Sequence, residues 1–157
     1  MGRGTKNKRW RGMVAAMASL ALTGLWAQTF AGVVTVEELK SRVANTGVGD
    51  RPPLCIQISE RQLDVADRLY VAGESDKAQA ALVDVTAYSE LARDYAIQTH
   101  KHEKQSEIAI RKMTRKLANL KHSVTREEQK QIQDTIDRLE KVRDDLLAAM
   151  FPHGAKK

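Results

Sequence analysis

The sequence predicts an all-α fold, because helix breakers are absent from a long stretch and apolar residues recur there at helical spacing. Between Leu54 and Phe151 the chain has no proline and a single glycine, Gly73. Glycine and proline are the strongest local breakers of regular structure, so this region is expected to be almost entirely helical. β-Branched residues are scattered and form no alternating run, which gives strands no support.

Three helices are expected in this region, over residues 54–72, 76–121 and 126–150. The first follows a pair of prolines at 52–53, which suits a helix entrance, and stops at Gly73, a natural C-terminal cap. The third begins with Thr125 and Glu128, which form a capping box. These signals divide the region into a short helix, a long one and a second short one.

The middle helix carries the most regular pattern in the chain. From residue 78 to residue 120 the seam positions alternate four and three apart over six heptads, which predicts one long helix with coiled-coil-like packing. The seam is apolar at both ends and polar at its centre, at Thr99, Glu103 and Ser106. This helix is about 69 Å long, similar to the two short helices together. We therefore expect an elongated antiparallel hairpin or three-helix bundle, with the short helices folded back along the two halves of the long central one.

The N-terminus has the three parts of a secretory signal peptide. Basic residues extend to Arg11, an apolar run covers residues 13–26, and small residues precede Ala31. We expect residues 1–31 to be removed by cleavage after Ala31. The alternative is an uncleaved anchor, which the shortness of the apolar run disfavours. The expected location is a bacterial periplasm, with release to the medium as the alternative, and no stable membrane span is expected after signal removal.

The charge of the chain changes once this segment is removed. The full chain has 26 basic and 20 acidic residues, a net charge of +6. Residues 1–31 contain five basic and no acidic residues, so 21 basic and 20 acidic residues remain, a net charge of +1. Both tryptophans leave as well, and few aromatic faces remain on which bases could stack. Nucleic acid is therefore not an expected partner.

Two short segments flank the helical region. In residues 32–53, Thr35 and Glu38 form a capping box before a short helix, and the glycine- and proline-containing stretch behind it is typical of a flexible linker. Residues 152–157 are expected to form a tail.

Catalytic chemistry has no support in the sequence. We find no glycine-rich phosphate loop and no serine elbow motif, and no histidine is placed to activate the one cysteine. We therefore expect a protein that is not an enzyme, uses no cofactor and has no small-molecule substrate.

Two candidate sites rest on single side chains or small sets. Cys55 is the one cysteine, in a compartment expected to be oxidising. It is either a small buried apolar residue at the start of a helix or the link in an intermolecular disulfide. His100, Glu103 and Glu107 share one helix face and offer one nitrogen and two carboxylates to a metal ion. Ordinary polar surface residues explain the same pattern.

The stretch 111–129 begins basic and ends acidic. Its basic side chains form a candidate anion-binding patch: Arg111, Lys112, Arg115, Lys116 and Lys121. A second interpretation needs no ligand, because the helix over 126–150 would fold back with acidic side chains and meet the basic run. Exposed pairs of this kind stabilise by only ~0–1 kcal/mol each.

The stretch VADRLYVAGESDKAQAAL resembles a tetratricopeptide-type helical hairpin over about residues 58–90. Five positions match the packing residues of that repeat: Ala66, Leu69, Gly73, Ala78 and Leu82. The usual tryptophan and closing proline are missing and there is no second copy, so the resemblance implies similar local packing but no peptide-binding superhelix. The stretch VTREEQ is similar to the motif of small periplasmic helical chaperones of the Spy and CpxP type, which places leucine first and glutamine one residue earlier.

The sequence therefore predicts an exported helical protein that works through its surfaces, as a protein–protein interaction or scaffold module of the cell envelope. Small residues on the long helix would let a second copy or an envelope partner approach closely: Ala78, Ala81, Ala92 and Ala96. The alternative is a periplasmic chaperone-like or metal-stress protein, and a chaperone would expose an apolar concave face to unfolded clients.

Overall fold

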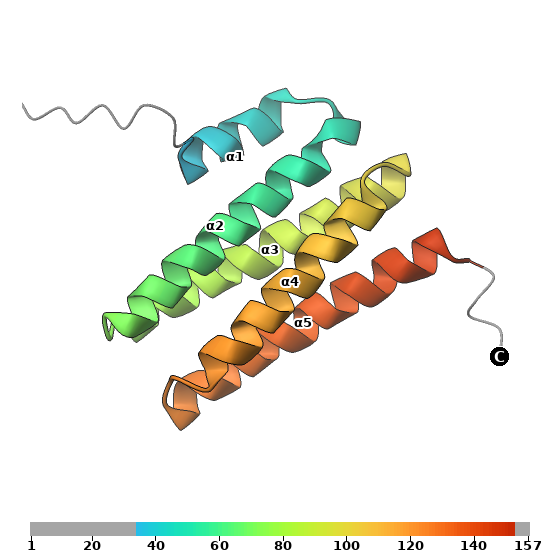
Figure 1. The fold of residues 1–157 in the computed structure, drawn as a ribbon. Coiled ribbons are helices and arrows are strands. Elements are labelled where there is room, and N and C mark those ends of the chain that lie inside the picture. Colours follow the sequence, from blue (N-terminus) through green and yellow to red (C-terminus); the bar gives the residue numbers. More distant parts are fainter. Residues whose placement is uncertain (1–33, 153–157) are drawn as a thin grey trace, which may run out of the picture. The chain divides into compact units, whose positions relative to one another are not determined.

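A computed structural model describes residues 34–152 of the chain (Figure 1). Its elements are α1 (Val36–Asn45), a 3-10 helix (Val48–Asp50), α2 (Arg51–Val71), α3 (Ser75–Thr99), α4 (Glu103–Lys121) and α5 (Arg126–Met150). The all-α class is confirmed, since these described residues contain only helices and the segments that connect them. The predicted signal peptide, residues 1–31, lies outside the described part, as do residues 153–157 of the predicted tail.

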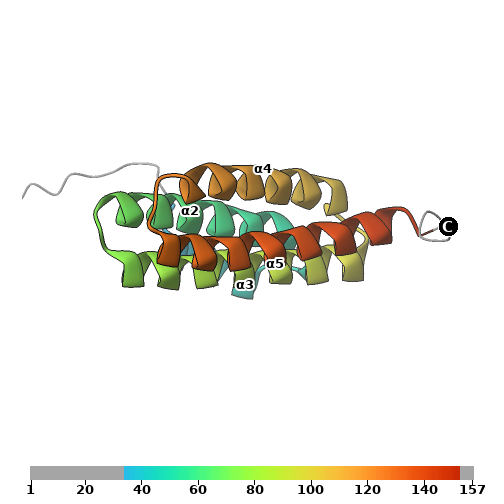
Figure 2. The same ribbon diagram turned by 90° about the horizontal axis from the view of Figure 1, so that it is seen from below.

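Helices α2 to α5 form a four-helix bundle in which each helix runs antiparallel to the one before it (Figure 1). α2 packs most extensively on α3, α4 on α5 and α3 on α5, while α2 and α4 share a smaller contact. Figure 2 shows the two layers that result, with α2 and α4 in one and α3 and α5 in the other. The two helices of a layer are parallel, because two chain reversals separate them. α1 packs on the outer side of α2.

One apolar core lies between the two layers. Its fully buried large side chains come from all four bundle helices and include Leu63, Val85, Ile110, Leu117, Ile132, Leu139 and Leu146. Burial of each such side chain stabilises the fold by ~1.5–3 kcal/mol. The four alanines of the predicted seam, at 78, 81, 92 and 96, are buried in the same core, with at most 7% of their surface exposed. Their face is used inside the chain and is not offered to a second copy.

The prediction of one long helix over residues 76–121 is wrong, because α3 ends at Thr99 and α4 begins at Glu103. His100 and His102 have left-handed backbone conformations, with φ of 52° and 62°, and they reverse the chain. The reversal falls at the polar centre of the predicted seam, where a straight helix would have no apolar side chains to bury. Folding back there brings both apolar ends of the seam into one core. The two expected hairpins, α2 with α3 and α4 with α5, are both present.

The substitution His100→Gly is expected to raise the free energy of unfolding by roughly 0.5–1 kcal/mol. A left-handed φ is unfavourable for a residue with a side chain and costs glycine nothing, although glycine gains freedom in the unfolded chain. The same substitution at His122, an exposed cap with φ of −74°, is expected to lower the free energy of unfolding by a similar amount. Urea unfolding of both variants measures the two signs. Destabilisation at both positions would mean that residue 100 is not left-handed.

Local signals in the sequence account for the helix ends. α2 has Pro52 and Pro53 in its first turn. The N–H groups of a first turn have no acceptor within the helix, so proline, which lacks this group, costs no hydrogen bond there. The turn after α2 contains Gly73 with φ of 75°, a conformation that glycine adopts without strain. At the start of α5 the Thr125 amide donates to Glu128 Oε2 at 2.8 Å, and the Glu128 amide donates back to Thr125 Oγ1 at 3.5 Å. This is the expected capping box.

The expected short helix before the bundle is α1. The Glu38 amide donates to Thr35 Oγ1 at 3.2 Å, and Leu39 is fully buried against the bundle. The stretch predicted as a flexible linker differs, because it contains the 3-10 helix and is tied back by a bond from Arg51 Nε to the Thr46 carbonyl at 2.9 Å.

Candidate functional site

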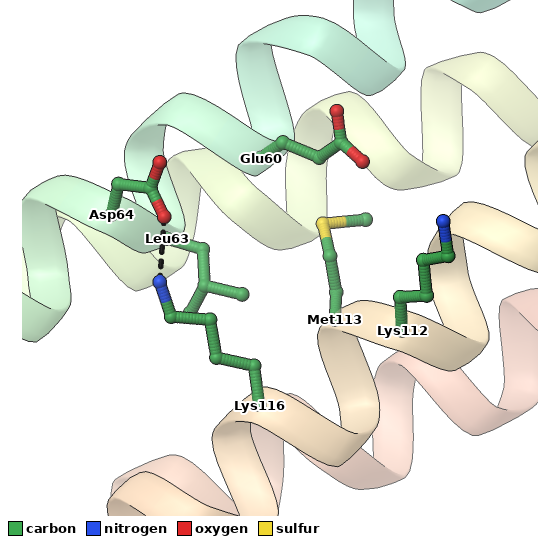
Figure 3. A pocket seen from close by; sticks show the side chains of 6 residues that line it. All are labelled: Glu60, Leu63, Asp64, Lys112, Met113 and Lys116. Atoms are coloured by element: carbon green, nitrogen blue, oxygen red, sulfur yellow. Dashed lines mark hydrogen bonds and ion pairs between the residues drawn. The ribbon is translucent and has the colours of Figure 1, made fainter.

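One part of the bundle surface that could recognise a partner is the space between α2 and α4. These two helices are parallel neighbours with a smaller contact than α3 and α5 have. Leu63 of α2 and Met113 of α4 form an apolar floor, 1% and 3% exposed. A cavity of about 280 Å³ lies against them, lined by Glu60, Leu63, Asp64, Lys112, Met113 and Lys116 (Figure 3). The floor is apolar and its borders are charged.

A second cavity continues this space towards the N-terminal ends of the same two helices. It has a volume of about 330 Å³ and is lined by Pro53, Ile56 and Gln57 of α2 and by His102, Gln105 and Ser106 of α4. Together the two cavities define what we call the α2–α4 groove, from Pro53 to Asp64 on α2 and from His102 to Lys116 beside and along α4. At 1.5 Å per residue the groove is about 22 Å long. The end of the groove near Pro53 and His102 is largely apolar and uncharged, and the end near Asp64 and Lys116 is charged.

The two walls of the groove carry opposite charges. Glu60 and Asp64 project from α2, and Lys112 and Lys116 project from α4 (Figure 3). Asp67 of α2 adds to the acidic side through its ion pair with Lys116. Lys116 Nζ lies 2.6 Å from Asp64 Oδ1 and 3.4 Å from Asp67 Oδ2. The hydrogen bond to Asp64 is the main cause that raises the pKa of Lys116, and the charges of both carboxylates add to it. Since the side chains of this cluster are 39–62% exposed, each pair stabilises the bundle by only ~0–1 kcal/mol.

Glu60 and Lys112 differ from this cluster because both are exposed and neither has an ion-pair partner among residues 34–152. Figure 3 shows them on opposite walls beside Met113. Two unpaired charges of opposite sign at one level of a groove are available to a partner that carries the reverse arrangement.

The predicted anion-binding patch is divided by the fold. Lys112 and Lys116 line the α2–α4 groove, whereas Lys121 Nζ donates to Gln133 Oε1 of α5 at 2.6 Å. Arg111 Nε lies 3.9 Å from Glu107 Oε1 on its own helix, and Arg115 is exposed. The acidic partner of Lys116 comes from α2, not from α5 as expected, because the reversal after α3 places α2 beside α4. The spacing of Glu60, Asp64 and Asp67 on one helix face was the sequence signal for this wall.

The three candidate metal ligands are not brought together. His100 Nδ1 lies 3.5 Å from Glu103 Oε1, but Glu107 accepts a 2.8 Å hydrogen bond from Arg143 Nε of α5. Within residues 34–152 the structure gathers no group of three side chains that could hold a metal ion. Glu107 is 7% exposed and serves to join α4 to α5. No pattern in the sequence indicated that Arg143 would be its partner.

Cys55 is free and fully buried in the core, which supports the packing interpretation over the intermolecular disulfide. Burial raises the pKa of its thiol to about 11, so little reactive thiolate forms at neutral pH. We expect a thiol reagent at pH 8 to label the native protein at least about tenfold more slowly than the urea-unfolded protein. Absorbance of the released chromophore measures both rates. Equal rates would show that Cys55 is open to solvent and free to cross-link.

Glu128 ties together the N-terminal ends of α3 and α5. Its carboxylate accepts hydrogen bonds from Ser75 Oγ, from Thr125 Oγ1 at 2.7 Å and from the Thr125 amide at 2.8 Å. These bonds, with that of Ser75 the strongest contribution, hold the pKa of Glu128 below its ordinary value.

The substitution Glu128→Gln should therefore lower the thermal midpoint at pH 7, where Glu128 is ionised in both folded and unfolded chains. A lowered folded-state pKa stabilises the fold above the pKa of the unfolded chain, and this stabilisation is lost as the pH falls through the folded-state pKa. The midpoints of wild type and variant should converge as the pH falls below the ordinary glutamate pKa of about 4.3 and through the lowered folded-state pKa. A gap that stays constant on acidification would contradict this origin.

The described residues contain no helix that is both long enough and apolar enough to cross a membrane. Comparison with known proteins adds no relative, because no family model, no curated protein and no solved structure matches the chain.

Proposed function

We propose that this chain is a non-enzymatic interaction module of the cell envelope, exported by its N-terminal segment, which binds a helix of a protein partner in the α2–α4 groove. The observation that carries this proposal is the groove itself: two parallel helices with the buried apolar floor of Leu63 and Met113 and walls of opposite charge.

A helix is the partner element that fits such a groove best. Amphipathic helices commonly bind by laying their apolar face into a groove between two helices, with apolar residues three or four apart as anchors. Here the anchors would enter the two cavities along about 22 Å of groove, which matches about four turns of helix. A matching helix carries basic residues on the side facing Glu60 and Asp64, and acidic residues on the side facing Lys112. Such charge matching selects the partner and its direction more than it adds affinity.

The distribution of exposed apolar side chains favours a specific groove over a chaperone surface. The large apolar residues exposed within residues 34–152 are Val48, Val71, Val83, Leu91 and Phe151. They come from the 3-10 helix, the end of α2, α3 and the residue after α5, and one of them, Val83, lines a cavity between α3 and α5. A chaperone that holds unfolded clients needs a contiguous apolar surface.

Site-specific photo-crosslinking in cells that naturally produce the protein tests the docking function. A photo-reactive residue in place of Gln57, which is exposed and lines the groove, is expected to give one discrete adduct. The matched control is Ala118, which is exposed on α4 and does not line either groove cavity. No adduct at Gln57, or equal adducts at both positions, would overturn the proposal. Many adducts of different mass from both positions would indicate a chaperone instead.

Export is tested separately by the intact mass of the protein recovered from those cells. Cleavage after Ala31 predicts a chain that begins at residue 32. A full-length chain in the cytoplasm would overturn the envelope part of the proposal and leave the docking groove to be judged by crosslinking.

A further inference from the structure

The charges of the α2–α4 groove are arranged so that the groove can match a copy of itself. The acidic wall belongs wholly to α2 and the basic wall to α4. The two helices run side by side in the same direction, so that Glu60 and Asp64 lie opposite Lys112 and Lys116. Glu60 and Lys112, the unpaired charges, therefore lie on opposite sides of the groove at about one level. A partner with the reverse order of charges at that level would pair with both.

Two simple two-fold arrangements bring two such faces together, and they differ in which walls meet. If the axis runs across the helices, α2 faces α2 of the second copy, and acidic side chains meet acidic ones. If the axis runs parallel to the helices, α2 faces α4 of the second copy. Each residue then keeps its position along the helix direction, so each Glu60 meets Lys112 of the other copy. An isologous interface needs a self-complementary surface, and only the parallel axis provides it here.

We propose that a second copy of this chain packs over the α2–α4 groove with its own α2 and α4, in a two-fold dimer whose axis runs parallel to these helices. This inference rests on the proposed function of the groove as a docking surface, and it names a partner that covers the groove with a pair of helices instead of a single one. In the second cavity of the groove, Pro53 and Ile56 of each copy then face His102 and Gln105 of the other copy.

The size of the groove sets the expected strength of this dimer. A face about 22 Å long and two helices, or about 20 Å, wide covers about 450 Å² on each copy, about 900 Å² in total. Specific stable interfaces bury about 1,200–2,000 Å², so the contact belongs to the weak, transient class. We expect a monomer–dimer equilibrium with a dissociation constant of about 10–100 µM, with dimer appearing only at high protein concentration.

Sedimentation velocity of the purified protein over a concentration series, with reductant present, tests the dimer. The reductant removes any contribution from Cys55. Glu60→Lys gives two basic walls and Lys112→Glu gives two acidic walls at this level, so each variant alone should dimerise about tenfold more weakly than wild type. An equimolar mixture of the two variants restores opposite charges at both contacts, and should associate within about threefold of wild type.

The control for net charge is Arg115→Glu, which makes the same charge change as Lys112→Glu at an exposed position of α4 that lines neither groove cavity. It should leave the dissociation constant within about twofold of wild type. Circular dichroism confirms that each variant keeps its helices, as expected for side chains that have no ion pair in the bundle.

Wild-type protein that remains monomeric up to about 1 mM would overturn the dimer, since its dissociation constant would then be at least about tenfold above the expected range. A dimer that the two single substitutions leave unchanged would place the interface elsewhere, and a mixture that fails to recover would overturn the parallel axis. If the protein is monomeric while Gln57 still crosslinks to a different protein, the second copy is excluded and the docking function stands. Monomeric protein without any Gln57 adduct overturns both.

Discussion

The substitution Leu139→Ala is expected to lower the free energy of unfolding by about 3 kcal/mol, within the range of about 2–5 kcal/mol for leucines in protein cores. Leu139 lies in the middle of α5 with none of its surface exposed, and it belongs to the single core shared by both hairpins. The loss combines the transfer of the missing methyl groups to water with the cavity that rigid neighbours leave behind. Urea unfolding measures it as a lower midpoint with an unchanged slope.

Leu91→Ala is the matched control for this prediction. Leu91 lies on the outer side of α3 and is 38% exposed, so truncation removes less buried surface and leaves no closed cavity. Its free energy of unfolding should fall by less than about 1 kcal/mol. Equal losses at both positions would mean that α5 is not packed into a common core.

The substitution Ala92→Leu is expected to lower the free energy of unfolding by about 2 kcal/mol, within the 1–3 kcal/mol typical of overpacking. Ala92 has none of its surface exposed, so three extra carbon atoms must push neighbouring helices apart or take strained rotamers. Thermal or urea unfolding of the purified variant measures the loss. Ala87→Leu, on the exposed side of the same helix, should change stability by no more than about 0.5 kcal/mol.

This pair of substitutions also separates two views of the alanine-rich seam. The sequence suggested that Ala78, Ala81, Ala92 and Ala96 would let a second copy approach the long helix, whereas the structure buries them within one chain. If Ala92→Leu instead left the monomer as stable as wild type and abolished association, the seam would be an intermolecular contact. Loss of monomer stability assigns the seam to the interior and leaves association to the α2–α4 groove.

Most of the helical content could be predicted from local chemistry. The capping box of Thr125 and Glu128 and the glycine at 73 act within one turn of the chain, so their effect is readable from neighbouring residues. The two hairpins followed from the lengths of the predicted helices, because the two short ones together match the long one. Each of these signals depends on a few residues close together in the sequence.

The reversal at residues 100–102 could not be predicted in the same way. His100 and His102 carry no glycine or proline signal, and the four–three spacing of the seam continues across them. What decides the outcome is the polar centre of the seam: a straight helix would leave it bare, whereas folding back buries both apolar halves together. This is a comparison between two whole arrangements, and no single local pattern contains it.

The candidate site depends on that reversal and could therefore not be predicted from the sequence either. Lys116 meets Asp64 and Asp67 only because α4 turns back and lies beside α2. The pairing of Glu107 with Arg143 likewise needs the register between α4 and α5, which charge patterns alone do not fix. The individual wall residues were visible as charged stripes, but their neighbours were not.

The order of the helices in the bundle has a consequence for how quickly the protein can fold. Apart from α3 with α5 and α2 with α4, its main contacts join helices that follow one another in the chain, so the loops that must close are short. Domains with such local contacts fold within microseconds to milliseconds. A chain exported as proposed here can be degraded by proteases for as long as it is unfolded. A topology of successive hairpins lets each pair of helices form as soon as it has emerged, and so shortens the time during which the chain can be degraded.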